Sequence, residues 1–161
     1  MFQHKIGDIH EKLAMSLEDE GNYAGAEEHF VKANKHREAV LMYVHAKDWS
    51  AAERVAAASD DQNSLQDILI GQASQAFINK EYQKAEAFLL RAEKPEIAVD
   101  LYREAGKLED ALRVAKEYAP SMASEIQREY VEAGGPSTSS SSKERDVYFL
   151  LEVSLSVFES P

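Results

Sequence analysis

The sequence contains no cysteine, which excludes disulfide bonds, thiolate catalysis and zinc sites built on cysteine ligands. Glycine and proline are scarce, at 7 and 4 of 161 residues, so few positions interrupt a helix. Basic residues number 18 against 29 acidic ones, which gives a net charge of −11 at pH 7. A chain this acidic is not expected to bind nucleic acid or an anionic membrane surface, because both are held by excess positive charge.

Long apolar runs are also missing. No stretch is long enough for a membrane-spanning helix, and the first residues, Met1 to Ile6, lack the apolar core of a signal peptide. We therefore expect no membrane insertion and a cytoplasmic chain, which at 161 residues is long enough to bury a hydrophobic core.

The main positive feature of the sequence is an internal repeat. The region from Tyr23 to Ala56 recurs without a gap from Tyr82 to Ala115, and 13 of the 34 aligned positions are identical. Alanines recur at one fixed interval in both copies, at positions 26, 39 and 52 and again at 85, 98 and 111. A helix of about ten residues and a short turn account for this interval, with alanine where neighbouring helices approach closely.

Apolar spacing predicts a succession of amphipathic helices. They are expected over residues 6–20, 23–33, 35–46, 48–57, 65–79, 81–92, 95–105, 108–118 and 122–131, the fifth being the longest. In the first helix, Ile6, Ile9, Leu13 and Leu17 are expected to form the buried stripe.

Two features of the fifth predicted helix concern its start and its middle. Ser64, with Asp67 three residues later, resembles a capping box. Gly71 indicates either a close contact with another helix or a weak point in the helix.

These helices predict an all-α fold, a tetratricopeptide-like (TPR-like) α-solenoid of antiparallel helix pairs, with eight or nine helices. The solenoid is expected over residues 1–133, with repeat blocks at about 6–58 and 65–118 and the start of a third at 120–132. A linker rich in serine and glycine is expected at 134–143. Residues 144–161 form an apolar tail foreign to the repeat, whose alternating Leu151, Val153, Leu155 and Val157 have the period of a strand.

No residue pattern predicts catalysis, a cofactor or a metal. The five histidines are expected at the surface or at a groove edge, because no two lie four residues apart on one helix face; they are His4, His10, His29, His36 and His45. Carboxylates, Glu27 among them, are expected on helix surfaces and at helix ends, where they favour solubility. Gly134 and Gly135 lead into proline and serine and so do not form a phosphate-binding loop.

Most aromatic residues follow the helical spacing and are expected in the core. Trp49 differs, because Leu108 occupies the equivalent position in the second copy, so the fold does not require an indole there. A half-exposed tryptophan is a favoured anchor in protein interfaces. We therefore predict Trp49 as a protein-interaction residue.

Three segments, Leu13–Ala33, Glu38–Ala56 and Gln83–Tyr118, resemble the C-terminal solenoid of the intraflagellar transport protein 172 family. The most specific parts are the run from Leu41 to Trp49 and the run Phe88–Ala92, and the resemblance covers roughly residues 6–132. The resemblance implies a scaffold of the intraflagellar transport B complex, acting in cilium assembly at the cilium and the ciliary base. Its implied partners are other transport subunits, with no small-molecule substrate.

The leading hypothesis is therefore a non-enzymatic module for protein–protein interaction. The alternative within binding proteins is another intracellular trafficking or coat-like helical-repeat scaffold, which partner identity would distinguish. An enzyme accessory or hydrolase domain is a second class of function, but the sequence offers no combination of nucleophile, base and orienting residue.

Overall fold

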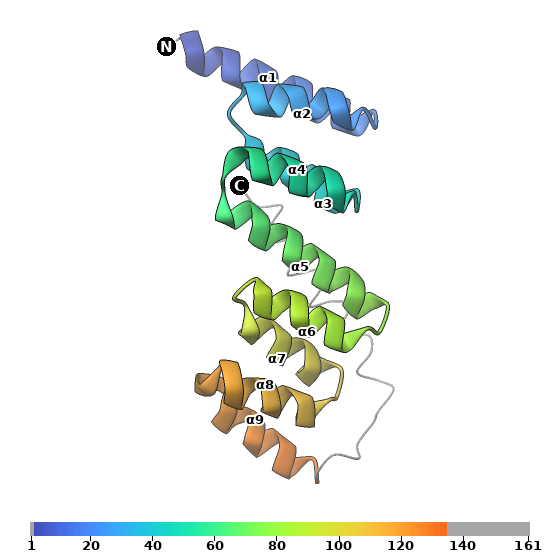
Figure 1. The fold of residues 1–161 in the computed structure, drawn as a ribbon, viewed down its shortest axis with the longest axis vertical. Coiled ribbons are helices and arrows are strands. Elements are labelled where there is room, and N and C mark those ends of the chain that lie inside the picture. The colour runs from blue at the N-terminus through green and yellow to red at the C-terminus, as the bar shows by residue number, and fades with distance from the viewer. Residues whose placement is uncertain (1, 135–161) are drawn as a thin grey trace. The chain divides into compact units, whose positions relative to one another are not determined.

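The structure, a computed structural model, describes residues 2–134 (Figure 1). Residues 135–161 lie outside the described residues, and with them nearly all of the predicted linker and the whole apolar tail. The described residues form helices joined by short connections, so the predicted all-α, solenoid-type fold is confirmed. None of the described helices is long and apolar enough to cross a membrane.

The helices of the described region follow one another almost without interruption. They are α1 (Phe2–Asp19), α2 (Tyr23–Lys32), α3 (His36–His45), α4 (Trp49–Ser59), α5 (Gln62–Ile78), α6 (Tyr82–Arg91), α7 (Pro95–Glu104), α8 (Leu108–Tyr118) and α9 (Pro120–Glu132). The predicted ranges agree with these bounds apart from small shifts at the ends. The expectation that the fifth helix is the longest is wrong, because α1 has 18 residues and α5 has 17.

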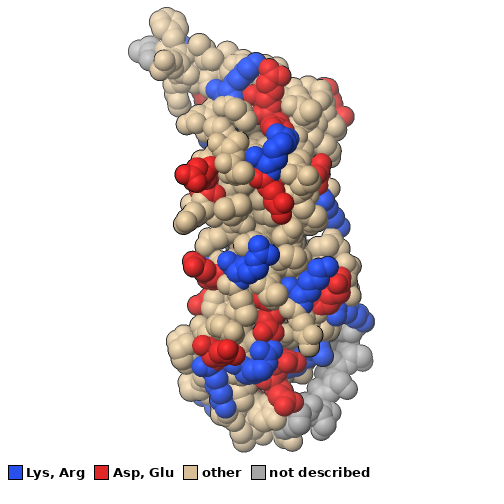
Figure 2. Space-filling model, viewed as in Figure 1, with Lys and Arg blue, Asp and Glu red and all other residues tan. Residues whose placement is uncertain are grey.

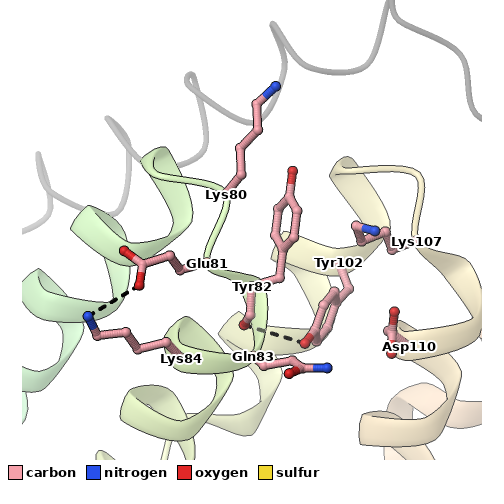
Figure 3. A pocket seen from close by; sticks show the side chains of 8 residues that line it. All are labelled: Lys80, Glu81, Tyr82, Gln83, Lys84, Tyr102, Lys107 and Asp110. Atoms are coloured by element: carbon pink, nitrogen blue, oxygen red, sulfur yellow. Dashed lines mark hydrogen bonds and ion pairs between the residues drawn. The ribbon is translucent and has the colours of Figure 1, made fainter.

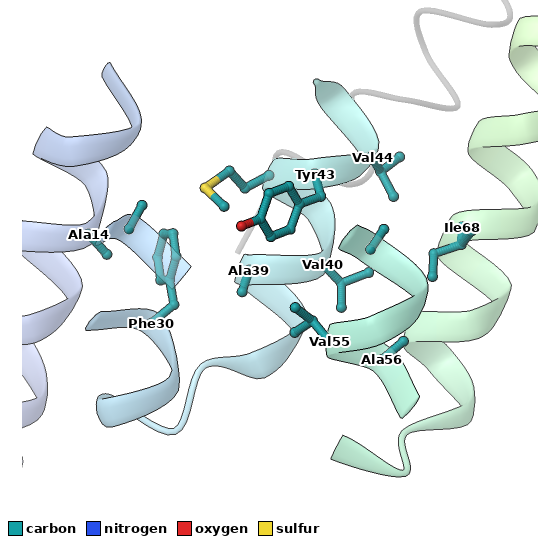
Figure 4. Close-up of a cluster of buried hydrophobic side chains, with 12 residues drawn as sticks. Ala14, Phe30, Ala39, Val40, Tyr43, Val44, Val55, Ala56 and Ile68 are labelled. Atoms are coloured by element: carbon teal, nitrogen blue, oxygen red, sulfur yellow. The ribbon is translucent and has the colours of Figure 1, made fainter. Parts of the chain in front are cut away.

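The chain divides into two compact units, with the division inside α5 between Gly71 and Gln72. In the first unit α1 packs on α2, α2 on α3 and α3 on α4. In the second unit the same succession joins α6, α7, α8 and α9. Figure 4 shows the core of the first unit, in which Phe30, Val40 and Ile68 from three different helices meet in one buried cluster.

The periodic alanines lie where the sequence predicts helix contacts. All six are at most 2% exposed: Ala26, Ala39, Ala52, Ala85, Ala98 and Ala111. A side chain of one carbon lets two helix backbones approach closely, so the period marks the contact positions of the repeat.

The turns repeat as regularly as the helices. A residue with left-handed backbone follows the helix at each of six turns, at the same interval as the alanines within each copy: Gly21, Asn34, Lys47, Lys80, Glu93 and Gly106. At each one the next residue donates its backbone N–H to a carbonyl of the last helical turn, as Asp48 does to Tyr43 at 2.9 Å. This is the Schellman ending of a helix, which satisfies carbonyl groups that would otherwise lack a partner.

The predicted capping box of α5 is wrong. The helix begins at Gln62, so Ser64 lies inside its first turn, fully buried, and donates its hydroxyl to Asp61 at 3.0 Å. Asp61 performs the capping, because its carboxylate accepts the backbone N–H of Asn63 at 3.0 Å. Asp67 instead receives two hydrogen bonds from Arg37 of α3, at 2.8 and 3.2 Å.

Gly71 is a point of close helix contact. A Cβ atom at this position would lie 2.7 Å from Cγ1 of Val44 and 3.1 Å from the Trp49 ring. Of the two interpretations of this glycine, the close contact is confirmed. The missing side chain lets α5 pack against the end of α3 and the start of α4.

Candidate protein-interaction site

The first helix exposes a row of large apolar side chains. Phe2, Ile6, Ile9 and Leu13, which we call the α1 stripe, are 82%, 53%, 57% and 45% exposed. The expectation that Ile6, Ile9 and Leu13 are buried is therefore wrong. The helix packs through a neighbouring face instead, where Ala14 is fully buried and Leu17 contacts the core cluster.

The spacing of the α1 stripe places its four side chains on a single face of the helix. They lie at positions i, i+4, i+7 and i+11, which is the pattern by which one amphipathic helix docks against another. Aligned apolar side chains of this size make a contiguous exposed patch, which in soluble proteins typically marks an interaction site.

Trp49, the residue predicted to bind a partner, is the first residue of α4 and is half-buried. Its six-membered ring covers Gly71 of α5 and packs against the core cluster of the first unit. Part of the indole therefore helps to pack α4 on α5. The presence of Leu108 at the equivalent position of the second copy does not indicate this packing role. The pairing of a tryptophan with a glycine inside a helix is the sequence signal for this contact. The role of Trp49 in partner binding stays a prediction.

A partly buried carboxylate ties three helices of the first unit together. Glu27 of α2 accepts a hydrogen bond of 2.6 Å from the hydroxyl of Tyr43 on α3. It also accepts two bonds of 2.7 Å from the guanidinium of Arg54 on α4. The expectation that Glu27 lies on the helix surface is wrong, since its side chain is only 18% exposed. We call this group the Glu–Tyr–Arg cluster.

The second unit contains the same cluster at the equivalent positions of the second copy. Glu86 of α6 accepts a bond of 2.6 Å from Tyr102 on α7 and bonds of 3.0 and 2.8 Å from Arg113 on α8. All three residues are among the identities between the two copies. The sequence thus contained the signal for the cluster, because a charged residue repeated in register with a tyrosine and an arginine indicates a shared contact.

The cluster changes the protonation equilibria of its members. The hydrogen bonds from Arg54 lower the pKa of Glu27. Burial by itself raises the pKa of Glu86, but the hydrogen bonds from Arg113 and Tyr102 outweigh it and lower that pKa. Burial, together with the bond to Glu27, raises the pKa of Tyr43 to about 12. The charged carboxylate and the neutral phenol are thus the stable forms in the folded chain.

Two histidines that are distant in sequence lie together between α1 and α2. The Nδ1 atoms of His10 and His29 are 2.8 Å apart and their rings are stacked with centroids 5.1 Å apart. Spacing along one helix does not predict this contact, because each ring comes from a different helix. Among residues 2–134, no group of three or more histidines and carboxylates is arranged to hold a metal ion.

The charged side chains do not form one large patch of a single sign on the face drawn in Figure 2, where lysine and arginine alternate with aspartate and glutamate. Charged residues of opposite sign also form ion pairs between helices. Arg103 of α7, for example, binds Glu125 at 3.0 Å and also Glu129, both on α9. Charged side chains of both signs thus help to join neighbouring helices.

Comparison with known proteins identifies similar sequences over most of the chain. It is 54% identical over 132 residues, 82% of the chain, to the intraflagellar transport protein 172 homologue of Danio rerio. The human homologue is 50% identical over 128 residues, and intraflagellar transport protein 172 of Chlamydomonas reinhardtii is 42% identical over 133 residues. No family model matches the chain.

The chain spans only a small part of these relatives, namely 8% of the Danio rerio and Chlamydomonas reinhardtii proteins and 7% of the human one. The resemblance expected from the repeat region is confirmed over about the same length of chain. The chain is therefore a homologue of one segment of intraflagellar transport protein 172.

Proposed function

We propose that the chain is a non-enzymatic protein-interaction module of the intraflagellar transport machinery. Its partners are other subunits of the intraflagellar transport B complex, and its place of action is the cilium and the ciliary base during cilium assembly. The proposal is supported by the identity of 42–54% to proteins named for intraflagellar transport. No cofactor or small-molecule substrate is part of it.

The observation that carries the interaction role is the α1 stripe. Four large apolar side chains, up to 82% exposed, occupy one face of a helix that packs on the fold through a different face. We propose that a partner helix covers this face, with its own apolar side chains inserted between those of the stripe. The spacing of the stripe fits a helical occupant, because helices dock on one another through apolar side chains at positions such as i, i+4 and i+7.

Trp49 is the second proposed contact residue, through the part of the indole that is not packed on Gly71. The proposal can be tested with Trp49→Leu, which introduces the residue that the second copy already has at the equivalent position, Leu108. We expect this variant to fold and to bind the partner less tightly, since tryptophan anchors often cost about 2 kcal/mol or more when truncated.

The experiment is a pull-down of the full chain with purified transport-complex subunits, analysed for each subunit separately. We expect the wild-type chain to retain at least one subunit and Ile6→Ser/Ile9→Ser to retain at least tenfold less. Both substituted residues are more than half exposed, so circular dichroism should show unchanged helix content. Leu65→Ser is the matched control, because Leu65 is 46% exposed on α5, outside the stripe.

Failure of the wild-type chain to retain any subunit would contradict the proposal. The alternative, a coat-like or other trafficking scaffold, predicts retention of coat subunits in the same assay and no retention of transport subunits. Turnover of a substrate that a single His or Glu substitution abolishes would contradict the non-enzymatic assignment.

A further inference from the structure

The second unit has a pocket of about 370 Å³ where α6 and α8 begin (Figure 3). Three lysines line it, Lys80 before α6, Lys84 in its first turn and Lys107 before α8, together with Tyr82. The ammonium group of Lys107 lies 4.9 Å from the centre of the Tyr82 ring. A cation over an aromatic face is attracted by the ring quadrupole, which favours a position of the Lys107 ammonium group at the pocket.

The first unit has the same backbone but lacks these cations. The equivalent positions of the first copy hold Gly21, Gly25 and Asp48 in place of the three lysines. The charged residues that line the pocket, the lysines with Glu81 and Asp110, sum to +1, whereas the equivalent residues of the first copy sum to −1. The repeat folds with either set, so the fold does not require the lysines.

The pocket residues also suit the local backbone conformation less well than the equivalent residues of the first copy do. Lys80 has φ of +62°, a left-handed conformation that is strained for lysine and natural for the equivalent Gly21. Lys107 precedes α8 without a side-chain capping bond, whereas the equivalent Asp48 accepts the N–H of Ala51 at 3.1 Å. Left-handed Lys47 and Glu93 and the uncapped helices α3 and α7 show the same features outside the pocket, so it is the comparison between the two copies that distinguishes these positions.

The same comparison holds for Glu81. It occupies the capping position of α6 without a side-chain capping bond, while the equivalent Asn22 caps α2 by accepting the N–H of Gly25 at 3.1 Å. Glu81 instead forms an ion pair of 3.3 Å with Lys84, drawn as a dashed line in Figure 3. An exposed pair of this kind contributes little to stability, and an incoming carboxylate can exchange for Glu81 at small cost.

We propose that this pocket binds an acidic peptide segment of a partner protein. Carboxylate groups would pair with Lys80, Lys84 and Lys107, and an apolar part of the peptide would lie on the Tyr82 ring. The volume suits two or three side chains, since ligand pockets in proteins begin at about 300 Å³. A local excess of positive charge in a chain of net charge −11 selects for an anionic segment by complementarity.

The proposal rests on the proposed role as an interaction module, but it uses a different site from the α1 stripe and Trp49. It is tested by fluorescence anisotropy with a labelled peptide of alternating glutamate and leucine, and with the same peptide carrying glutamine in place of glutamate. We expect the full chain to bind the glutamate peptide at least tenfold more tightly than the glutamine peptide, with affinity falling as salt is added.

The decisive variant is Lys80→Gly/Lys107→Asp, which introduces the residues of the first copy. Because glycine suits the left-handed turn and aspartate caps α8, this variant should be as stable as the wild type or more so. Circular dichroism of the variant separates a loss of binding from unfolding. We expect at least a tenfold weaker binding of the glutamate peptide.

Lys47→Gly is the matched control, since it also replaces a left-handed lysine and removes one positive charge, but in the first unit. It should leave peptide binding unchanged. Equal binding of both peptides, equal binding by the double variant, or no binding of the glutamate peptide would each overturn the proposal, as would binding confined to a phosphorylated peptide. Retention of transport subunits by the double variant, with peptide binding lost, would leave the α1 stripe proposal standing.

Discussion

The guanidinium of Arg54 donates two hydrogen bonds of 2.7 Å to the carboxylate of Glu27, which lies two helices earlier in the chain. Glu27 thereby fixes α4 to α2, and through Tyr43 it also fixes α3. The helices of the first unit are also joined by apolar contacts through their buried core cluster. A bidentate ion pair has a defined geometry and so determines the register of the three helices.

Replacing Glu27 with alanine should destabilise the first unit by about 1–3 kcal/mol, because the Tyr43 hydroxyl is then buried without its acceptor. Urea unfolding monitored by circular dichroism measures this change. Glu28→Ala is the control, since Glu28 is exposed and forms an ion pair with Lys32 on its own helix. An effect of Glu27→Ala no larger than that of the control would contradict a structural role for the cluster.

Acid should weaken both units through their clusters. The pKa values of Glu27 and Glu86 are lowered in the folded chain, so the stability they contribute is present above their unfolded pKa of 4.5. This contribution to stability is lost as the pH falls through the lower pKa values that the two carboxyl groups have in the folded chain. We expect the unfolding free energy of the wild type to drop below pH 4.5, and that of Glu27→Gln/Glu86→Gln to start lower at pH 7 and to drop less steeply. Parallel curves for the two proteins would show that other carboxylates determine the acid response.

The two copies of the repeat have different residues at one equivalent left-handed turn, so the steric cost of a side chain there can be tested in both directions. Lys47 has φ of +59°, and the equivalent turn of the second copy has Gly106 at φ of +74°. Since lysine pays a steric cost there, Lys47→Gly should raise the unfolding free energy by about 0.5–1 kcal/mol. Gly106→Lys should lower it by a similar amount. Thermal melts of both variants measure the changes, and equal signs for the two substitutions would contradict the explanation.

The succession of helices and the contact alanines could be predicted from the sequence, because both depend on local spacing that repeats. Ala26 and its five counterparts were identified by their regular interval alone, and all are buried. The same logic applied to Glu27, Tyr43 and Arg54, which also repeat in register. Residue type alone places a carboxylate of an amphipathic helix on the surface, and only its repetition in register indicates the contact.

The errors in α1 and α5 have a different origin. The face of α1 that carries Ile6, Ile9 and Leu13 has the largest apolar side chains, but the helix packs through Ala14, because a small residue permits closer approach to α2. The spacing of Ser64 and Asp67 predicts a cap, whereas Asp67 is bound by Arg37 of a different helix. Partners distant in sequence, such as His10 and His29, leave no trace in the spacing of one helix.

Gly71 gives the sharpest test of packing in the first unit. Gly71→Ala places a Cβ atom 2.7 Å from Val44 and 3.1 Å from Trp49, which is closer than atoms can approach without displacement. We expect a loss of about 1–3 kcal/mol in the unfolding free energy, although alanine is otherwise the better helix former. Urea unfolding measures the loss, and near-ultraviolet circular dichroism should report a changed environment of the single tryptophan.

Gly7→Ala is the matched control, because Gly7 also lies inside a helix and a Cβ there meets nothing within 4 Å. It should stabilise the chain by up to about 1 kcal/mol, since only the helix propensity changes. Gly71→Ala/Val44→Ala removes the closest neighbour of the new Cβ, so its loss should be smaller than the sum of the two single losses. Additive losses would mean that Val44 does not limit the contact, and a stable Gly71→Ala variant would mean that α5 moves away from α4 at no cost.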